Sequence, residues 1–433
     1  MDRALADISR QLDAAQPPEG ETLSLRRRRV LLTGYRSHPH VGGQGVYLRE
    51  LAIGLRDLGH SVTIASGPPY PEVPEGVAFV GFPSLNLFEE ANAFLALRWK
   101  HLASRADRSE WLAHNTGAFG ELKAFALRLA AWLESRAGAF DVVHDNQTLA
   151  SPFVSIRRRL PVVATIHHPV AIDREFAVAG ARKRIDRWLT RRWYGFTDMQ
   201  ARTVRALPHL LAVSEAARDS HAEHYGMPPD KAEIAHNGLD HDVFHPDDTV
   251  RREPGLIAAT ASADVPIKGL DVLMSAFIRL AHRNPAVRLE LIGQLRDGPA
   301  KQLLTDAGLL DRVKMRSGVS REAIADLYRR ASVVACPARF EGFGFPAAEA
   351  MACGAPVVAS DGGALPEVVG EAGRIVPAGN VDALTLALQA VLNDAALAAD
   401  MSRAGADRAR SAFCWRQHAL AASALYEKAI AGC

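Results

Sequence analysis

Short apolar runs alternate with longer helical patterns along this chain, and the alternation occurs twice. The first series lies at 30–33, 61–65, 77–82, 141–144, 161–167, 210–214 and 233–236. The second series lies at 256–260, 287–292, 313–317, 332–336, 356–360 and 374–376. Apolar runs of this length, bounded by turn residues and separated by helices, are typical of βαβ units and parallel sheets. The sequence therefore predicts an α/β fold with two Rossmann-like halves.

A polar stretch without apolar periodicity separates the two series and is predicted to be a linker, at 241–254. A chain of 433 residues is long enough for two domains. We expect an N-terminal extension at 1–29, a first domain at 30–240 and a second at 255–412. The Ala-rich end of the chain is predicted to be helical, and our hypothesis is that 413–433 packs back on the first domain.

Charge and cysteine content exclude several classes of protein. The formal net charge is only +2, so the whole chain gives no indication of nucleic-acid binding. Its four cysteines show no CxxC spacing, which fits reduced thiols in a cytoplasmic protein. The sequence has no apolar stretch long enough to cross a bilayer, and the charged first 29 residues do not resemble a signal peptide. We therefore expect a cytoplasmic location.

The strongest local signal is the segment 340–354, which follows a predicted strand. Its Gly342 and Gly344 let the main chain approach a ligand closely, just before a helix predicted at 346–353. The free N–H groups at a helix N-terminus attract phosphate or sugar oxygens. Glu341 and Glu349 could both accept hydrogen bonds from one polyhydroxy ligand. The structural alternative is a glycine turn with two solvated glutamates.

Three further motifs stand at predicted strand ends, where α/β sheets bind ligands. Gly42 and Gly43 precede the helix that includes 47–58 and are typical of a loop that contacts phosphate or an acceptor hydroxyl. Lys268 precedes another helix and could neutralise a leaving phosphate, although a solvated surface lysine is the alternative. His167 ends a strand and could bind a sugar hydroxyl, although a core histidine is the alternative. No further ligand stands at metal-binding spacing from His167, so no metal is expected.

Taken together, these motifs resemble the retaining glycosyltransferases of family 4, which adopt the two-domain GT-B fold. The most specific match is the E-x7-E element of Glu341 and Glu349. The Gly-Gly loop, the Lys268-Gly269 pair and the segments 212–215 and 236–240 support it. The resemblance covers nearly the whole chain from residue 30 onward.

The resemblance implies a nucleotide diphosphate sugar as donor, bound mainly by the C-terminal domain, and transfer to an acceptor hydroxyl with retention of configuration. It implies neither a cofactor nor a metal. By this resemblance, Glu349 would bind the ribose and Lys268 the diphosphate. The donor sugar would contact His167, Glu341 and the amides of Phe343 and Gly344. The diphosphate or the acceptor entrance would be lined by Gly42 and Gly43. A covalent nucleophilic role for Glu341 is an alternative.

The chain departs from the family pattern at one position. An arginine usually stands five residues before the lysine, but this chain has Ala263 there. Part of the positive charge expected around a diphosphate is therefore missing. Our hypothesis is that Arg296 or Arg339 replaces it.

Cations and aromatic residues are concentrated at 182–194, in a helix-like pattern. Such a helix could lie on an anionic membrane surface, and it suggests a lipid or lipid-linked glycan as acceptor. The alternative is a solvated basic helix with Trp188 packed inward.

Two other functional classes stay open at this stage. One is a different GT-B enzyme, either a sugar-nucleotide epimerase or a glucan phosphorylase. An epimerase would need more catalytic carboxylates and histidines, and a phosphorylase would need a lysine that binds pyridoxal phosphate; the sequence indicates neither. The other class is a non-catalytic sugar-nucleotide-binding protein.

Overall fold

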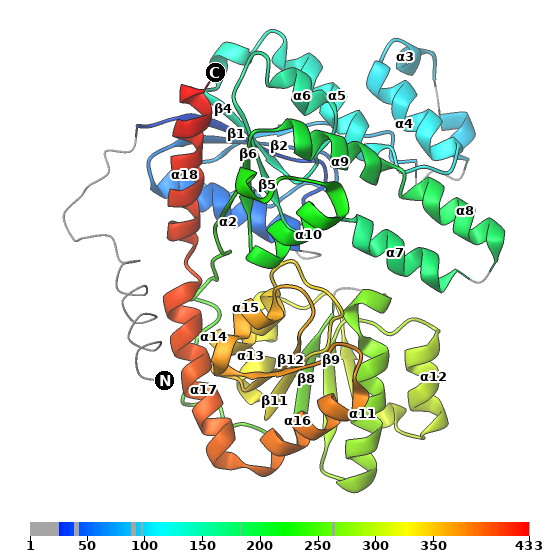
Figure 1. The fold of residues 1–433 in the computed structure, drawn as a ribbon, viewed down its shortest axis with the longest axis vertical. Helices are drawn as coiled ribbons and strands as arrows, with labels where there is room; N and C mark the ends of the chain where they lie inside the picture. The colour runs from blue at the N-terminus through cyan, green and yellow to red at the C-terminus, as the bar shows by residue number, and fades with distance from the viewer. Residues whose placement is uncertain are drawn as a thin grey trace.

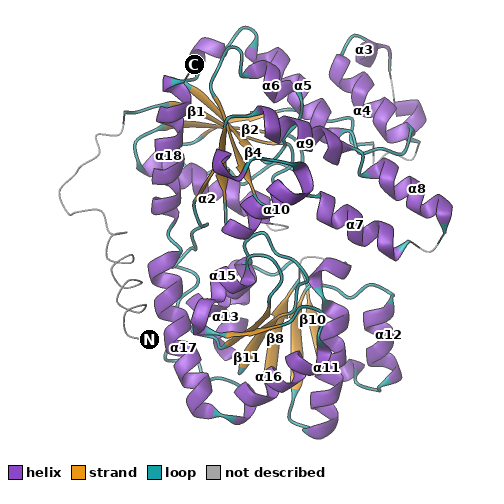
Figure 2. Cartoon of the chain, viewed as in Figure 1, coloured by secondary structure: helices purple, strands orange, loops and turns teal. Residues whose placement is uncertain are grey.

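The structure is a computed structural model, and it describes residues 26–38, 43–87, 92–96, 98–181, 183–261 and 265–432. It contains two parallel sheets, each with helices on both faces (Figures 1 and 2). The seven-stranded sheet has the order β3-β2-β1-β4-β5-β6-β7, and the six-stranded sheet has the order β10-β9-β8-β11-β12-β13. The predicted fold class, two α/β halves with parallel sheets, is confirmed.

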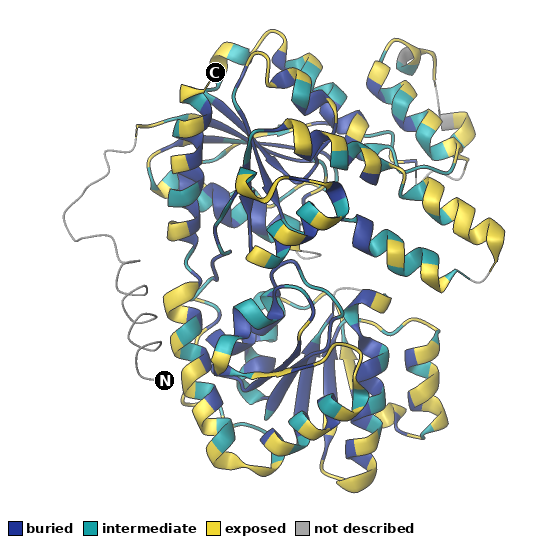
Figure 3. Cartoon of the chain, viewed as in Figure 1, coloured by how far each residue is buried: buried dark blue, intermediate teal, exposed yellow. Residues whose placement is uncertain are grey.

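Every predicted apolar run forms a strand, with ends that differ by at most two residues. The first sheet contains β1 (Arg29–Gly34), β2 (Ser61–Ser66), β3 (Ala78–Gly81), β4 (Val142–Asn146), β5 (Val162–Ile166), β6 (His209–Ala212) and β7 (Ala232–Ile234). The second contains β8 (Leu256–Thr260), β9 (Arg288–Ile292), β10 (Val313–Arg316), β11 (Val333–Cys336), β12 (Val357–Ser360) and β13 (Arg374–Val376). The central strands are buried on both faces (Figure 3). This burial explains their continuous apolar character.

Helices connect these strands in both halves. The first half contains α2 (Gly43–Asp57), α3 (Trp99–Leu102), α4 (Arg105–Asn115), α5 (Glu121–Leu133), α6 (Pro152–Ile156), α7 (Ala171–Gly180), α8 (Arg184–Trp193), α9 (Phe196–Ala206) and α10 (Glu215–Tyr225). The second contains α11 (Leu270–Arg283), α12 (Pro299–Asp306), α13 (Arg321–Arg330), α14 (Phe345–Ala352), α15 (Leu365–Val369), α16 (Val381–Asn393) and α17 (Ala395–Ala412). Short 3-10 turns include η4 (Pro266–Lys268), which precedes α11.

The last helix, α18 (Trp415–Ala431), leaves the second half and packs on the first (Figure 1). It lies against α2, where a side chain at Gly54 would come within 2.9 Å of the Ala419 methyl carbon. Its Glu427 forms an ion pair with Arg28 just before β1, at 2.5 Å. The chain therefore crosses between the halves a second time, at 413–414.

No single helix in the described part of the chain is both long enough and apolar enough to span a bilayer. The length and apolar character needed are reached only when α16 is taken together with the residues of α17 and α18, and a bend of 100° separates the two parts. The described cysteines, Cys336, Cys353 and Cys414, are free thiols.

Candidate functional site

The carboxyl ends of β8 and β11 border a pocket on the side of the second sheet that faces the first half. Ligands of α/β sheets bind at such edges. The pocket is lined by Thr260, Lys268, Cys336, Pro337, Ala338, Glu341, Gly344, Pro346, Ala347 and Leu365. Three of the predicted site residues are therefore in one pocket: Lys268, Glu341 and Gly344.

Lys268 and Glu341 form an ion pair across this pocket, with 2.7 Å between Nζ and Oε1. Lys268 is held there by a sharp turn, because Gly269 adopts a left-handed conformation with φ of 65°. A side chain at Gly269 would lie 2.1 Å from the carbonyl oxygen of Pro337. Both charged side chains remain partly exposed, so a ligand can reach them.

Helix α14 begins at the pocket, directly after the glycine loop. Gly344 precedes its first residue in a left-handed conformation with φ of 99°, which a residue with a side chain rarely adopts. The predicted helix of this motif is thus present, and Gly354 ends it with φ of 71°. The positive end of the dipole of α14 favours an anion in the pocket.

Glu349 lies on α14, and burial raises the pKa of its carboxyl to about 8, although the charge of Arg321 acts in the opposite direction. Cys336, at the end of β11, lines the pocket together with Lys268 and Glu341. Its pKa is raised by burial and then by the charges of Glu341 and Glu349, while Lys268 opposes them. Lys268 and Glu341 therefore meet in the pocket, and Glu349 lies on the helix that begins there.

His167 follows β5 in the first half, and its ring lies against Asn146 and Tyr47. Burial, with a smaller contribution from neighbouring histidines, lowers the pKa of its imidazole to about 3. The ring is therefore neutral at ordinary pH. Tyr47 of α2 packs edge-on against it, with ring centroids 4.7 Å apart.

The glycine loop of the second half touches the first half directly. A side chain at Gly342 would lie only 2.3 Å from the carbonyl oxygen of His167. Ser214 donates a hydrogen bond to the carbonyl oxygen of Gly342, at 2.6 Å. Gly43, the first residue of α2, lies beside the ring of Phe345, which a side chain at Gly43 would contact at 3.4 Å. The glycine loop of the second half and the loop that carries His167 are therefore in contact.

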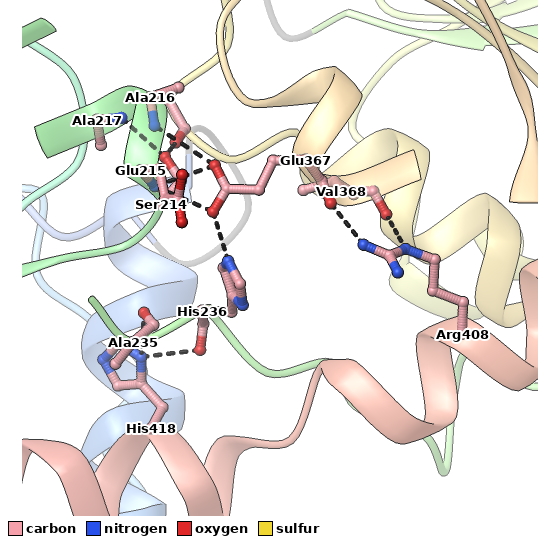
Figure 4. Close-up of polar contacts among 11 residues, drawn as sticks. Ser214, Glu215, Ala216, Ala217, Ala235, His236, Glu367, Val368, Arg408 and His418 are labelled. Atoms are coloured by element: carbon pink, nitrogen blue, oxygen red, sulfur yellow. Dashed lines mark hydrogen bonds and ion pairs between the residues drawn. The ribbon is translucent and has the colours of Figure 1, made fainter. Parts of the chain in front are cut away.

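A second contact between the halves surrounds Glu367 of α15 (Figure 4). Its carboxylate accepts hydrogen bonds from the N–H of Glu215 at 3.0 Å, at the start of α10, and from Nε2 of His236 at 2.6 Å. Arg408 of α17 donates to the carbonyl oxygens of Glu367 and Val368. Although burial raises the pKa of Glu367, the hydrogen bonds from His236 and α10 lower it below its ordinary value.

These contacts explain the segments 212–215 and 236–240, the two shorter motifs that support the resemblance. Ser214 caps α10 by accepting from the N–H of Ala217 at 2.9 Å, while its hydroxyl holds the glycine loop. Gly238 leaves room for the second crossing, because a side chain there would lie 2.1 Å from the backbone nitrogen of Trp415. Both motifs therefore serve the junction between the halves.

Sequence reasoning missed Glu367, and it also missed the polar residues Asn146 and Gln147 at the end of β4. Asn146 contacts the ring of His167, and Gln147 binds its backbone N–H. A polar run directly after a buried strand was the available signal for these two. For Glu367, the signal was a glycine pair, at 362–363, followed by Pro366 at the start of a helix.

The remaining predicted residues are placed as follows. Phe343 is buried and packs against Phe345 and Phe413, so only its backbone is available to a ligand. Arg339 forms two hydrogen bonds with the carboxylate of Asp271, at 2.9 and 2.7 Å, and thus holds the start of α11. Arg296 is exposed. The structure does not bring either arginine into the pocket lining, and their role as replacement cations stays a prediction.

Gly42 and Ala263 lie outside the described residues. Within the described residues, no group of three or more His, Cys, Asp or Glu side chains is arranged to hold a metal ion.

Two family models match consecutive parts of the chain. The model described as Glycosyltransferase Family 4 matches residues 41–243, and the model described as Glycosyl transferases group 1 matches residues 244–408. Their boundary falls at residues 243–244, between β7 and β8.

A full-length similarity links this chain to an enzyme of Mycolicibacterium hassiacum, the MMP alpha-(1→4)-mannosyltransferase. The two are 42% identical over 413 residues, which is 93% of this chain and 98% of the relative. Sucrose-phosphate synthase from Thermosynechococcus elongatus has a similar fold, with a TM-score of 0.71 and 21% identity over 94% of this chain and all of that one. HepE from Anabaena, solved with UDP and glucose, has a TM-score of 0.65 and 17% identity, with the same coverage.

Proposed function

Since the chain belongs to glycosyltransferase family 4, the retaining family that its motifs resemble, we propose that it transfers a mannosyl unit from a nucleotide diphosphate mannose to a sugar hydroxyl. The similarity to a mannosyltransferase carries this proposal, because it extends over both halves and therefore over the whole crevice. That relative's name also supports an α-(1→4) linkage in the product.

The charged groups in the pocket suit the donor. Lys268 and the N-terminus of α14 supply positive charge for a diphosphate. Glu341 can accept hydrogen bonds from the hydroxyls of the donor sugar, and Glu349 from those of the ribose. His167 lies across the crevice, where it can contact the sugar from the side of the first half.

The proposed reaction is a same-face substitution at the anomeric carbon. The bond from this carbon to the diphosphate oxygen breaks, and a bond to the acceptor oxygen forms. The departing phosphate oxygen takes the proton of the acceptor hydroxyl. Negative charge grows on the diphosphate during this step, so the preorganised cation and helix N-terminus stabilise the transition state more than the ground state.

The acceptor is proposed to be a glycan that ends in a mannose unit with a free 4-hydroxyl. Incubation of the protein with GDP-, UDP- and ADP-linked sugars and short α-(1→4)-mannosides tests this function. We expect transfer from a mannose donor, and we expect NMR of the product to show a new α-(1→4) linkage. Transfer only to a lipid-linked acceptor would support the lipid alternative instead. A β-linked product, or an exclusive preference for another sugar, would contradict the proposal.

Helix α8 is proposed to place the enzyme on an anionic surface. Its apolar residues Ile185, Trp188 and Leu189 are spaced for one face and are exposed; Trp188 is 58% exposed (Figure 3). The alternative, in which Trp188 packs inward, is therefore not observed. The helix and the residue before it carry an excess of positive charge, with Lys183, Arg184, Arg187, Arg191 and Arg192 against Asp186. Arg182 lies outside the described residues.

Binding to vesicles tests the role of α8. We expect the protein to pellet with vesicles that contain phosphatidylglycerol at low salt, and to be released at high salt. The double change Arg187→Glu with Arg191→Glu should abolish pelleting, whereas Arg403→Glu with Arg410→Glu on α17 should preserve most of it. If wild-type protein does not pellet, or if binding does not depend on salt, this proposal and the predicted location at the membrane surface are wrong.

A further inference from the structure

Asn146 and His167 lie side by side because of the sheet register. Asn146 is the last residue of β4 and pairs with Thr165 of β5, and His167 follows β5 directly. Asn146 is only 1% exposed, although its side chain is polar. We infer that Asn146 is a positioning residue that fixes the tautomer of His167 for sugar binding, an inference that rests on the proposed function.

The orientation of the Asn146 amide follows from its second partner. Its Nδ2 lies 3.0 Å from the backbone carbonyl oxygen of Gln44, near the start of α2. A carbonyl oxygen only accepts hydrogen bonds, so the amide nitrogen must point to Gln44. The amide oxygen of Asn146 therefore points to His167, where it lies 2.7 Å from Nε2.

This geometry decides where His167 carries its hydrogen. The oxygen of Asn146 is an acceptor, so Nε2 of His167 must be the protonated nitrogen. The other ring nitrogen, Nδ1, then holds a lone pair and can accept a hydrogen bond from a donor-sugar hydroxyl. A neutral imidazole of the opposite tautomer would offer an N–H there instead.

Neighbouring groups hold the ring in this one orientation. Tyr47 packs edge-on against it and is itself fixed by hydrogen bonds to Thr165 at 2.6 Å and to His418 of α18 at 2.8 Å. Gln147 fixes the backbone, because its side-chain oxygen accepts from the N–H of His167. Helix α18 thus helps to hold the ring of His167 in place through Tyr47.

The surroundings also keep the ring uncharged. The titratable groups around His167 are Tyr47, His144, His168, His221 and His418. Because burial and these histidines disfavour a second proton, Nδ1 keeps its lone pair throughout the ordinary pH range. A carboxylate placed at Asn146 would reverse this effect.

The substitutions Asn146→Ala and Asn146→Asp test the inference, with the exposed Asn393→Asp as the matched control. We expect Asn146→Ala to lower kcat about tenfold or more, since a buried hydrogen bond is lost and the ring can change tautomer. In Asn146→Asp, the new carboxylate should raise the pKa of His167. As pH falls through this raised pKa, Nδ1 gains a proton and kcat should decline, a step that wild type and Asn393→Asp should lack because their His167 stays neutral.

Selective ¹⁵N labelling of histidine separates this inference from the proposed function. In the wild-type protein, the imidazole shifts of His167 should show hydrogen on Nε2 and none on Nδ1, with a mixture of tautomers in Asn146→Ala. A hydrogen on Nδ1 in wild type, or an unchanged pH profile in an active Asn146→Asp, would overturn the inference. If wild type transfers no sugar at all, the proposed function fails, and the NMR result still decides the tautomer.

Discussion

Replacing Lys268 by alanine is expected to lower kcat for sugar transfer by about 10²- to 10³-fold while the protein stays folded. Lys268 is the cation in the pocket lining, and its Nζ lies 2.7 Å from Oε1 of Glu341. Without it, a partly buried carboxylate would face the diphosphate with no compensating charge. Both the lost stabilisation and the new repulsion reduce the rate.

A second lysine provides the matched control for this change. Lys301 also forms a 2.7 Å ion pair with a carboxylate, Asp297, but on the surface of α12. Lys301→Ala should leave kcat within about twofold, because an exposed ion pair contributes little to stability. Lys268→Arg should recover part of the rate by restoring the charge, and Glu341→Gln should be impaired while folded. Near wild-type turnover in both Lys268→Ala and Glu341→Gln would show that the site has been assigned wrongly.

Adding one methyl group at Gly342 is expected to reduce transfer by about 10²-fold or more. The methyl carbon would lie 2.3 Å from the carbonyl oxygen of His167, and 2.9 Å from the carbonyl carbon of the same residue. Neither backbone atom can move freely, so the two halves would have to separate at the glycine loop. The groups on the two sides of the crevice would then no longer meet on one donor.

Stability measurements distinguish this effect from misfolding. Large parts of the cores of the two halves lie away from the glycine loop, so the melting temperature of Gly342→Ala should change by only a few degrees. Gly138→Ala is the control, because a side chain there meets nothing within 4 Å. If Gly342→Ala transfers sugar as fast as Gly138→Ala, then contact between the glycine loop and His167 is not required for catalysis.

The strands could be predicted from the sequence because a strand that is buried on both faces consists of consecutive apolar residues. A strand such as β5 is buried at every position, so its apolar run is continuous and ends where the sheet ends. The same reasoning located Lys268, Glu341 and Glu349, which lie close to strand ends or on the helix that follows one. Their roles as contacts of the donor were implied by the family resemblance and stay predictions.

The contacts between the halves could not be predicted in this way. Glu367 binds the start of α10 across 152 residues of sequence, and His418 binds Tyr47 across 371. Neither pairing has a local period. The first depends on how the two sheets face each other, and the second depends on how α18 packs back on the first half. The same holds for the contact between Asn146 and His167, which depends on the register of β4 against β5.

The crevice between the two sheets is proposed to hold the donor by its diphosphate. A crystal structure of the protein with an intact nucleotide diphosphate mannose tests this claim most directly. We predict that the diphosphate contacts Lys268 and the N-terminus of α14, and that the sugar lies between Glu341 and His167. A donor bound elsewhere, with none of these groups in contact, would contradict the account.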